Sequence, residues 1–237
     1  MSDRDHHSLP AGNRLLASLP EEERDRVTSQ CEQVPLRVKD LLHEVDSPIP
    51  YVYFPRTGVI SVLLVMENGL AMEVGTVGNE GMVGVAVFLG ASRSPLMAIV
   101  QIPGEALRME AEAFREELRL GGSLHSLMHR YTQVTLKQTS QLAACNHLHS
   151  VEERMCRWLL MAHDRVESDE FPLTQEFLAE MLVVRRPSVT VIAGALQRGG
   201  LIRYSRGKIT VLDRAGLEAA SCECYRVFKE EHDRILS

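Results

Sequence analysis

The alternation of apolar and polar residues divides the chain into a β-rich part and several helical parts. From about residue 33 to 110, short apolar runs are separated by turn signals such as "SPIP", "RTG", "ENG", "GNEG" and "PGE". The runs are "YVYF", "GVISVLLVM", "AMEVGTV", "MAIVQI" and "ALRME". Short strands at this spacing predict an antiparallel barrel or sandwich of the jelly-roll type. Residues 12–32 before it have helical spacing, and Pro20 followed by three Glu is typical of a helix N-terminus.

A long helix is predicted from Ser123 to about His149, because this segment contains neither Pro nor Gly. Its heptad positions, spaced 4-3-4-3-4-3, are Leu127, Tyr131, Val134, Gln138, Gln141, Cys145 and Leu148. This spacing is typical of a coiled-coil seam over about three heptads, which is near the minimum length for a coiled coil. The two glutamines leave a buried core helix open as the alternative. The next helix, "SVEERMCRWLLMAHDRV", has Ser150 as its N-cap and Glu153 at the capping-box position.

From residue 173 onward, the pattern predicts three helical stretches and a hairpin. "LTQEFLAEML" opens with Thr174 as an N-cap, and "RPSVTVIAGALQRGG" ends in a Gly-Gly stop signal. "LIRYSRGKITVL" forms two strands around "SRGK", and a last amphipathic helix begins near Asp213. The order helix, short turn, helix and hairpin predicts a winged helix-turn-helix, whose second helix enters the DNA major groove. The fold class is thus α+β.

The start of that second helix carries the residues expected to contact DNA. Pro187 fits the first helical turn, where its missing N–H breaks no hydrogen bond. Arg185 and Arg186 then lie at the helix start, and arginine can bond O6 and N7 of guanine together. Ser188 and Thr190 are short enough to let the helix approach and can bond phosphate or base. The face that packs on the protein consists of Val189, Ile192 and Leu196.

The charge distribution supports a nucleic-acid partner, although the whole chain has a net charge of −6. Residues 171–211 hold six Lys or Arg against two acids, a balance of +4. The six basic residues are Arg185, Arg186, Arg198, Arg203, Arg206 and Lys208. A basic module on an acidic body is the electrostatic pattern expected of a DNA-binding domain.

The stretch "LTQEFLAEMLVVRRPSVTVIAGALQRGGLIRYSRGKITVL" resembles the DNA-binding end of the Crp/Fnr family of bacterial transcription regulators. The resemblance implies a cyclic-nucleotide-binding-like sensor domain at 1–120, a dimerisation helix at 121–149 and a winged helix-turn-helix domain at 150–237. It also implies that Thr174 holds a phosphate, that Arg186 and Thr190 read bases, and that Arg206 and Lys208 contact phosphates from the wing. The partners it implies are double-stranded DNA, a second copy of the chain and, for an activator, RNA polymerase.

Three positions depart from the family pattern. Pro187 stands where the family often has Glu, and Val191 where it often has Arg, so the DNA site should differ from those of the best-known members. Val183 occupies a turn position that commonly carries Gly. Because a β-branched residue resists positive φ, we expect a reshaped or strained turn there.

The sensor half contains a stretch, "NEGMVGVAVFLGASRSPLMA", that is similar to the family's phosphate-binding cassette. Gly81 and Gly84 match the glycines that let backbone approach a phosphate, and Arg93 and Ser94 match the pair that grips it. Met82 stands where a glutamate usually holds the ribose hydroxyl, and methionine accepts hydrogen bonds only weakly. A cyclic nucleotide is therefore disfavoured, and no cofactor is assigned. A different small ligand and no small ligand both stay open.

The five cysteines suggest neither a disulfide framework nor a zinc ribbon, because their number is odd and no CxxC pair occurs. Only Cys31 lies in the first 144 residues, so an iron–sulfur sensor with four cysteine ligands there is not supported. Cys222 and Cys224 fall in a helical pattern, in which positions i and i+2 point apart, so we expect no shared metal. A redox role for these two cysteines stays open.

The sequence does not suggest an enzyme, since it has no G-x-S-x-G, P-loop or Cys/His nucleophile arrangement. "HLHSVEE" matches a metal-dependent cupin motif in His147, His149 and Glu153, but it lies at a helix end rather than on a strand. No apolar run is long enough to span a bilayer, and the polar start "MSDRDHHSLPAGNRLL" is not a signal peptide, so a cytoplasmic location is expected. The alternative function is a β-roll sensor whose C-terminal module binds a protein partner.

Overall fold

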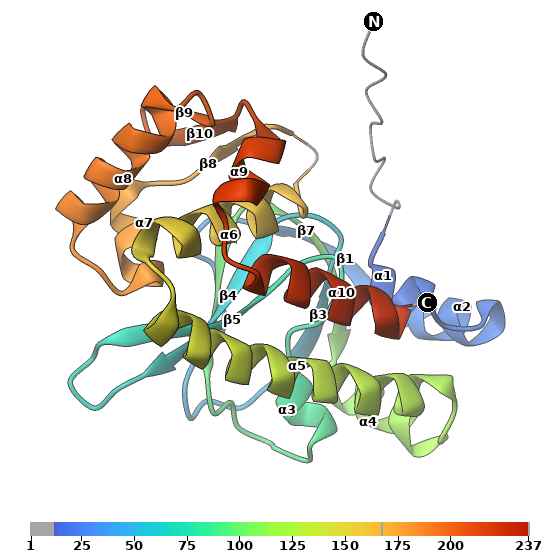
Figure 1. Ribbon diagram of the computed structural model, residues 1–237. Coiled ribbons are helices and arrows are strands. Elements are labelled where there is room, and N and C mark those ends of the chain that lie inside the picture. Colours follow the sequence, from blue (N-terminus) through green and yellow to red (C-terminus); the bar gives the residue numbers. More distant parts are fainter. Residues whose placement is uncertain (1–11, 167, 237) are drawn as a thin grey trace, which may run out of the picture.

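A computed structural model describes residues 12–166 and 168–236. Its N-terminal half is a roll of two antiparallel sheets (Figure 1). One sheet has the order β1 (Glu32–Leu36), β7 (Gly104–Glu110), β3 (Tyr51–Pro55). The other has the order β2 (Leu41–His43), β6 (Met97–Ile102), β4 (Val59–Val65), β5 (Ala71–Val77). The α+β class and the antiparallel roll are confirmed. The five quoted runs form β3 to β7, whereas β1 and β2 were not distinguished individually.

Short helices cover one end of the roll. They are α1 (Arg14–Ala17), α2 (Glu21–Ser29), α3 (Val85–Phe88) and α4 (Ala111–Arg119). Pro20 is the N-cap of α2, and the three glutamates that follow lie in its first turn, where they complement the positive end of the helix dipole. The ring of Phe54 from β3 packs edge-on against Phe114 from α4, with centroids 6.2 Å apart. Both rings are fully buried, so this contact ties the helical layer to the sheet.

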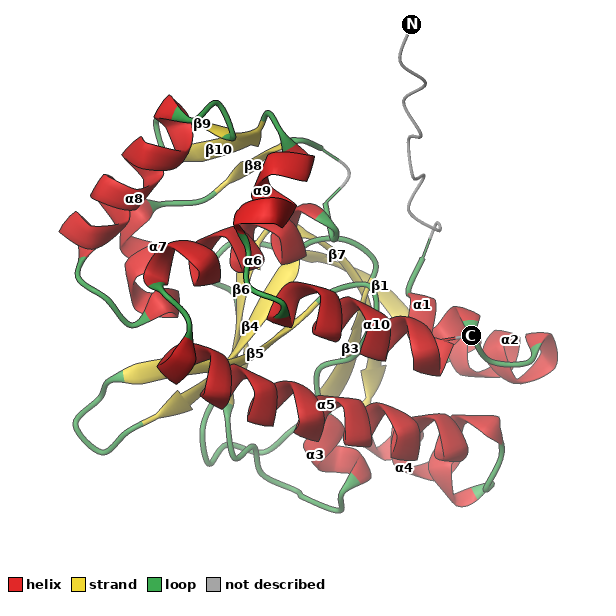
Figure 2. Cartoon of the chain, in the orientation of Figure 1, coloured by secondary structure: helices red, strands yellow, loops and turns green. Residues whose placement is uncertain are grey.

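The long helix α5 (Ser123–Leu148) runs along the roll, and α10 (Cys224–Leu236) lies beside it (Figure 2). The heptad spacing of α5 predicted a seam that faces a second chain. This prediction is wrong for most of the heptad positions. Leu127, Tyr131, Val134, Gln138 and Cys145 are all buried within the single chain. They pack against the roll and α10, so the alternative of a buried core helix describes this face. The opposite face is solvated and carries Leu136, which is 65% exposed.

The C-terminal half is a winged helix-turn-helix, as predicted. It contains α6 (Val151–His163), β8 (Glu170–Pro172), α7 (Gln175–Leu182), α8 (Arg186–Arg198), β9 (Ile202–Ser205), β10 (Lys208–Val211) and α9 (Arg214–Ala220). Ser150 and Glu153 form the predicted capping box at the start of α6.

Two features of this half differ from the sequence-based expectation. β8 adds a third strand to the hairpin, giving the order β8-β10-β9. The single last helix is in fact two, because the chain breaks between α9 and α10 at Ser221–Glu223. α10 then returns to α5. The predicted domain division at 120 and 149 stays a prediction.

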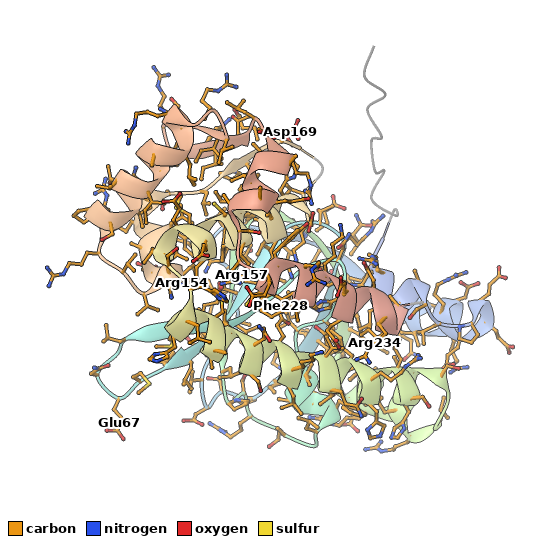
Figure 3. The ribbon with its side chains drawn as sticks, in the orientation of Figure 1. Glu67, Arg154, Arg157, Asp169, Phe228 and Arg234 are labelled. Atoms are coloured by element: carbon orange, nitrogen blue, oxygen red, sulfur yellow. The ribbon has the colours of Figure 1, made fainter. Side chains whose placement is uncertain are left out.

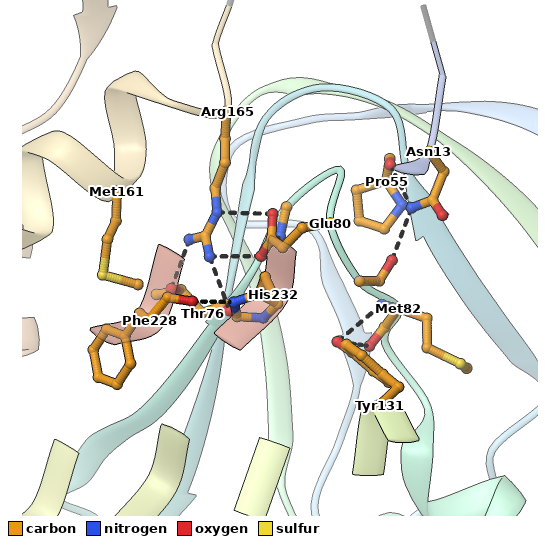
Figure 4. A network of polar contacts seen from close by, with 12 residues as sticks. Asn13, Pro55, Thr76, Glu80, Met82, Tyr131, Met161, Arg165, Phe228 and His232 are labelled. Atoms are coloured by element: carbon orange, nitrogen blue, oxygen red, sulfur yellow. Dashed lines mark hydrogen bonds and ion pairs between the residues drawn. The ribbon is translucent and has the colours of Figure 1, made fainter. Parts of the chain in front are cut away.

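The two halves are joined by buried polar contacts as well as by apolar packing (Figure 4). Arg165, just after α6, forms a salt bridge of 2.6 Å with Glu80 and donates to the Thr76 hydroxyl at 2.6 Å. Nearby, the Trp158 indole N–H donates to Glu73 at 3.2 Å, and Glu73 also accepts from the Ser61 hydroxyl at 2.7 Å. These contacts hold α6 against β4 and β5.

Part of the N-terminal stretch considered as a signal peptide, residues 1–11, lies outside the described residues. Among the helices within the described ranges, none is both long and apolar enough to cross a bilayer.

Candidate nucleic-acid interface

The first helix of the motif, α7, begins at a capped position. The Thr174 hydroxyl accepts a hydrogen bond of 3.2 Å from the N–H of Phe177, which satisfies one of the free donors at the helix start. A helix start leaves further backbone N–H groups without intrahelical partners and carries the positive end of the helix dipole, which favours a bound phosphate. Thr174 itself is exposed, as its expected phosphate-binding role requires.

The turn between α7 and α8 contains the strain that the sequence predicted. Val183 has φ 53° and ψ 50°, which is the left-handed region. A β-branched residue rarely adopts this conformation, and such strain costs on the order of 1–3 kcal/mol. Its side chain is 51% exposed, so buried contacts do not explain the choice of valine.

The second helix, α8, presents the predicted residues to solvent. Arg185 is its N-cap and Pro187 lies in its first turn. Arg185, Arg186, Ser188 and Thr190 are exposed. The packing face is confirmed in Val189 and Leu196, which are buried, while Ile192 is partly buried. The apolar face therefore fixes the orientation of α8, and its first turns point away from the protein.

The wing is a β-hairpin with a two-residue turn. Arg206 (φ 50°) and Gly207 (φ 75°) are both left-handed and link β9 to β10, as in a type I′ turn. Arg206 and Lys208 are exposed. Lys208 forms a 2.8 Å salt bridge with Glu170 of β8, and this bond is the first cause of the lowered pKa of the Glu170 carboxyl.

Short contacts connect the helix start, the capped turn and the wing into one surface. The Thr190 hydroxyl contacts the Arg186 carbonyl at 3.2 Å and donates to the Gln175 side chain at 2.8 Å. The Leu173 N–H donates to the Gly207 carbonyl at 2.8 Å. The structure thus brings all seven predicted residues to neighbouring elements. Gln175 was not predicted to belong to this surface, although its position directly after the N-cap of α7 could have indicated it.

The surface is cationic. Blue-tipped side chains project from α8 and the wing in Figure 3. Within the described part of the chain, no carboxylate forms a salt bridge with any of five exposed arginines. They are Arg185, Arg186, Arg198, Arg203 and Arg206. Unpaired arginines can bind phosphates bidentately or bond guanine, so the arrangement is chemically suited to a duplex.

The candidate effector residues are not brought together in the same way. Gly84 (φ 114°) and Ser94 line a cavity of about 120 Å³ between the roll and α5. Gly81 does not line this cavity, and a Cβ there would lie 2.1 Å from the Tyr131 hydroxyl. Arg93 is exposed and also absent from the lining. The Ser94 hydroxyl is already bonded to the Leu96 carbonyl at 2.6 Å.

The chemistry of this cavity is mostly apolar. Met82 is buried in its wall, and the N–H of Met82 donates to the Tyr131 hydroxyl at 3.0 Å. His43 also lines the cavity, and burial lowers its pKa, which favours the neutral ring. Neither Lys nor Arg is among the lining residues. The described cavity thus offers no fixed positive charge to a cyclic phosphate.

The described residues thus form a winged helix-turn-helix joined to an antiparallel roll by a long helix. Residues 153–220 match the family model of the Crp-like helix-turn-helix domain. No curated protein matches the sequence. The chain therefore carries a Crp-like helix-turn-helix domain, and the solved structures extend the likeness to the whole fold.

Three solved structures illustrate this likeness. A putative transcriptional regulator of the Crp/Fnr family from Eubacterium rectale has 16% identity and a TM-score of 0.66, covering 87% of this chain and 96% of its own. FixK2 from Bradyrhizobium japonicum has 14% identity and a TM-score of 0.65, with coverage of 81% and 98%. A CRP-family regulator from Thermus thermophilus has 19% identity and a TM-score of 0.63, with coverage of 79% and 96%. The chain has the Crp/Fnr regulator fold.

Proposed function

We propose that this protein is a sequence-specific transcription regulator that binds a palindromic DNA site as a homodimer, and that it is not an enzyme. The observation that carries the proposal is the start of α8, where Arg185 and Arg186 are exposed and lack a carboxylate partner within the described chain. In this role Arg186 and Thr190 read base edges, while Thr174, Arg206 and Lys208 hold phosphates.

Two residues on the outer face of α8 should influence the base sequence of the DNA site. Val191 is 69% exposed and has no hydrogen-bonding group, so it can contact a thymine methyl but cannot select a guanine. Pro187 leaves the first turn without an acidic side chain that could accept from cytosine. We expect guanine contacts from Arg186 beside a position that favours thymine.

A dimer would use the solvated face of α5. The other face is already buried in the chain, while Leu136 is 65% exposed and Ala143 and Ala144 are exposed on the same side. Small residues there allow two copies of α5 to approach closely. A two-fold axis along this face would present two α8 helices to successive major grooves, about 34 Å apart.

The sensor half would respond to a small uncharged ligand rather than a cyclic nucleotide. The cavity of about 120 Å³ lies beneath α5 and is lined by Tyr131, Thr135 and Gln138 of that helix. A comparable apolar cavity of about 150 Å³ holds one benzene ring. A ligand of that size would shift α5, and α5 leads directly into the DNA-binding half.

Selection of bound duplexes from a randomised DNA pool tests this proposal. We expect an enriched palindrome whose half-sites lie about one helical turn apart, and a steep loss of binding with salt. The matched control is Arg186→Ala, which should lose preference at one base pair in each half-site. Failure of the full chain to enrich any sequence, with or without small ligands, would instead favour a protein partner for the C-terminal module.

A further inference from the structure

Three cysteines and one histidine from distant parts of the sequence meet beside the joint between α5 and α6. Cys145 and His149 come from the end of α5, Cys222 from the loop after α9, and Cys224 from the first residue of α10. Their ligand atoms all lie within 4.8 Å of one another. The expectation that Cys222 and Cys224 point apart fails, because Cys222 precedes α10 instead of lying in a helix with Cys224.

We propose that these four residues form a structural zinc site. Three cysteine sulfurs and one histidine nitrogen are a common tetrahedral ligand set for Zn²⁺. In a tetrahedral site, Zn–S bonds of about 2.3 Å and Zn–N bonds of about 2.0 Å place neighbouring ligand atoms ~3.5–3.8 Å apart. The Cys145 and Cys222 sulfurs are 3.6 Å apart, and the Cys224 sulfur is 3.7 Å from Nδ1 of His149.

The size of the ligand set favours a single ion. An iron–sulfur cluster places several iron and sulfide atoms between its cysteine ligands. Four ligand atoms that all lie within 4.8 Å of one another enclose one metal ion and no multinuclear core. Because thiolates are soft ligands in a tetrahedral arrangement, zinc fits better than a hard cation such as Mg²⁺.

The residues around the ligands orient them for this role. Nε2 of His149 lies 3.1 Å from the Glu223 carboxylate, which leaves Nδ1 directed toward the cysteines. A histidine that ligates a metal commonly donates its other N–H to a carboxylate in this way. The Gln141 amide donates to the Cys224 sulfur at 3.1 Å, a bond that also stabilises a thiolate.

The local charge is also suited to an anionic metal centre. Arg154 and Arg157 are 7% and 3% exposed, and the Nε of each has no hydrogen-bond partner. Neither forms a salt bridge with a carboxylate in the described residues. Arg154 interacts electrostatically with Cys145 and Cys222, and Arg157 with Cys222. Three thiolates around Zn²⁺ carry a net charge of −1, which would balance part of this buried positive charge.

The site would fix the joint between the sensor and the DNA-binding half. His149 is the C-cap of α5, and Ser150 is the N-cap of α6. A metal that also binds Cys222 and Cys224 therefore ties this joint to the α9–α10 loop. Figure 3 shows Arg154, Arg157 and Phe228 gathered at the same place. The proposal concerns metal binding alone and does not depend on DNA binding.

Metal analysis of the full chain, produced in zinc-supplemented medium and purified under reducing conditions, tests the site. We expect about one zinc per chain, and, after exchange with Co²⁺, the visible absorption of tetrahedral cobalt with thiolate charge-transfer bands. Cys145→Ser and Cys222→Ser should lose the metal. Cys156→Ser, which changes a buried thiol of α6 outside the cluster, and Cys31→Ser should keep it.

A milder variant keeps the test valid if the cysteine variants fail to fold. Glu223 is exposed, and Glu223→Gln should weaken zinc binding 10–100-fold in competition with a chelator. Glu230→Gln, on the exposed side of α10, is the matched control and should leave the affinity unchanged. Wild-type protein without zinc, iron with sulfide in its place, or a Cys145–Cys222 disulfide under reducing conditions would each overturn the proposal, whatever DNA selection finds.

Discussion

The arginines of α6 and those of α8 are the same residue type in opposite environments. Arg154, Arg157 and Arg165, in or just after α6, are 7%, 3% and 5% exposed. Arg185 and Arg186, at the start of α8, are exposed to solvent. Water solvates the charge of the second group at little cost, whereas burial of a charge is unfavourable unless a counter-charge accompanies it. The difference separates arginines that are buried inside the protein from arginines that are available to a partner.

The carboxylates opposite α6 show the same rule. Glu80 is buried against Arg165, and its pKa is lowered: burial raises the pKa, but the charges of Arg165 and His232 and the hydrogen bonds to the carboxylate together outweigh that effect. Glu73 is equally buried but accepts hydrogen bonds from the neutral groups of Ser61 and Trp158. Its pKa is raised to about 7, chiefly because burial disfavours the charged form. A guanidinium in a direct salt bridge, as at Glu80, therefore decides whether a carboxylate in this interface stays ionised.

Removal of the buried countercharge should have the largest effect. Arg165→Ala leaves the Glu80 carboxyl buried between the halves without its salt-bridge partner, and we expect a loss of about 3–5 kcal/mol in the free energy of unfolding. Urea denaturation followed by tryptophan fluorescence measures it, since Trp158 lies in the same interface. The double variant Arg165→Met with Glu80→Gln should recover much of the loss. A single-variant loss below about 1 kcal/mol would contradict a structural role for this pair.

Replacement of Glu73, which forms no salt bridge within the described residues, should change stability in the opposite direction. The folded-state pKa of Glu73, about 7, is above its ordinary value of 4.5. Stability from this group is therefore fully present below about pH 4.5 and falls as the pH rises toward 7. Glu73→Gln removes that loss. Above pH 7 we therefore expect the free energy of unfolding of the variant to exceed that of wild type by up to about 3 kcal/mol.

Denaturation midpoints of wild type and Glu73→Gln across this pH range measure the gain. Glu67→Gln, an exposed position in the loop before β5, is the control and should leave the pH dependence unchanged. A constant difference between Glu73→Gln and wild type at all pH values would contradict the raised pKa.

Local periodicity was enough to predict most of the elements. The strands from β3 to β7 alternate or run apolar between turn signals, and α8 has a proline start and a Gly-Gly end. β8 was missed because three residues including Pro172 give too little pattern. The break at Ser221–Glu223 was missed because apolar spacing continues across it.

Tertiary proximity was harder to predict than exposure. The residues of α8 were identified because they are neighbours in sequence, and their exposure follows from one amphipathic helix. Cys145 and Cys222 are 77 positions apart, and only the return of α10 to α5 brings them together. The roll and α10 together bury most of the face of α5 that heptad spacing had assigned to a second chain. Helical spacing predicts that a face is apolar, but it does not say what covers that face.

The exposed arginines should respond to mutation in binding and not in stability. Arg186→Ala should leave the free energy of unfolding within about 0.5 kcal/mol of wild type. Its expected effect is a loss of about 1–3 kcal/mol of discrimination at one base pair per half-site. Binding to the selected palindrome and to the same duplex with that pair exchanged measures it. Equal losses on both duplexes would mean that Arg186 contacts only phosphate.

Lys208→Ala gives the smallest expected effect and completes the contrast. Lys208 is held by Glu170 at 2.8 Å in the free protein, so a phosphate contact must replace an existing ion pair and the net gain is small. We expect weaker binding to all sequences alike and a salt slope reduced by about one. Titrations at several salt concentrations measure the slope. A sequence-dependent loss would show that the wing reads bases, and the distinction between reading by α8 and holding by the wing would then fail.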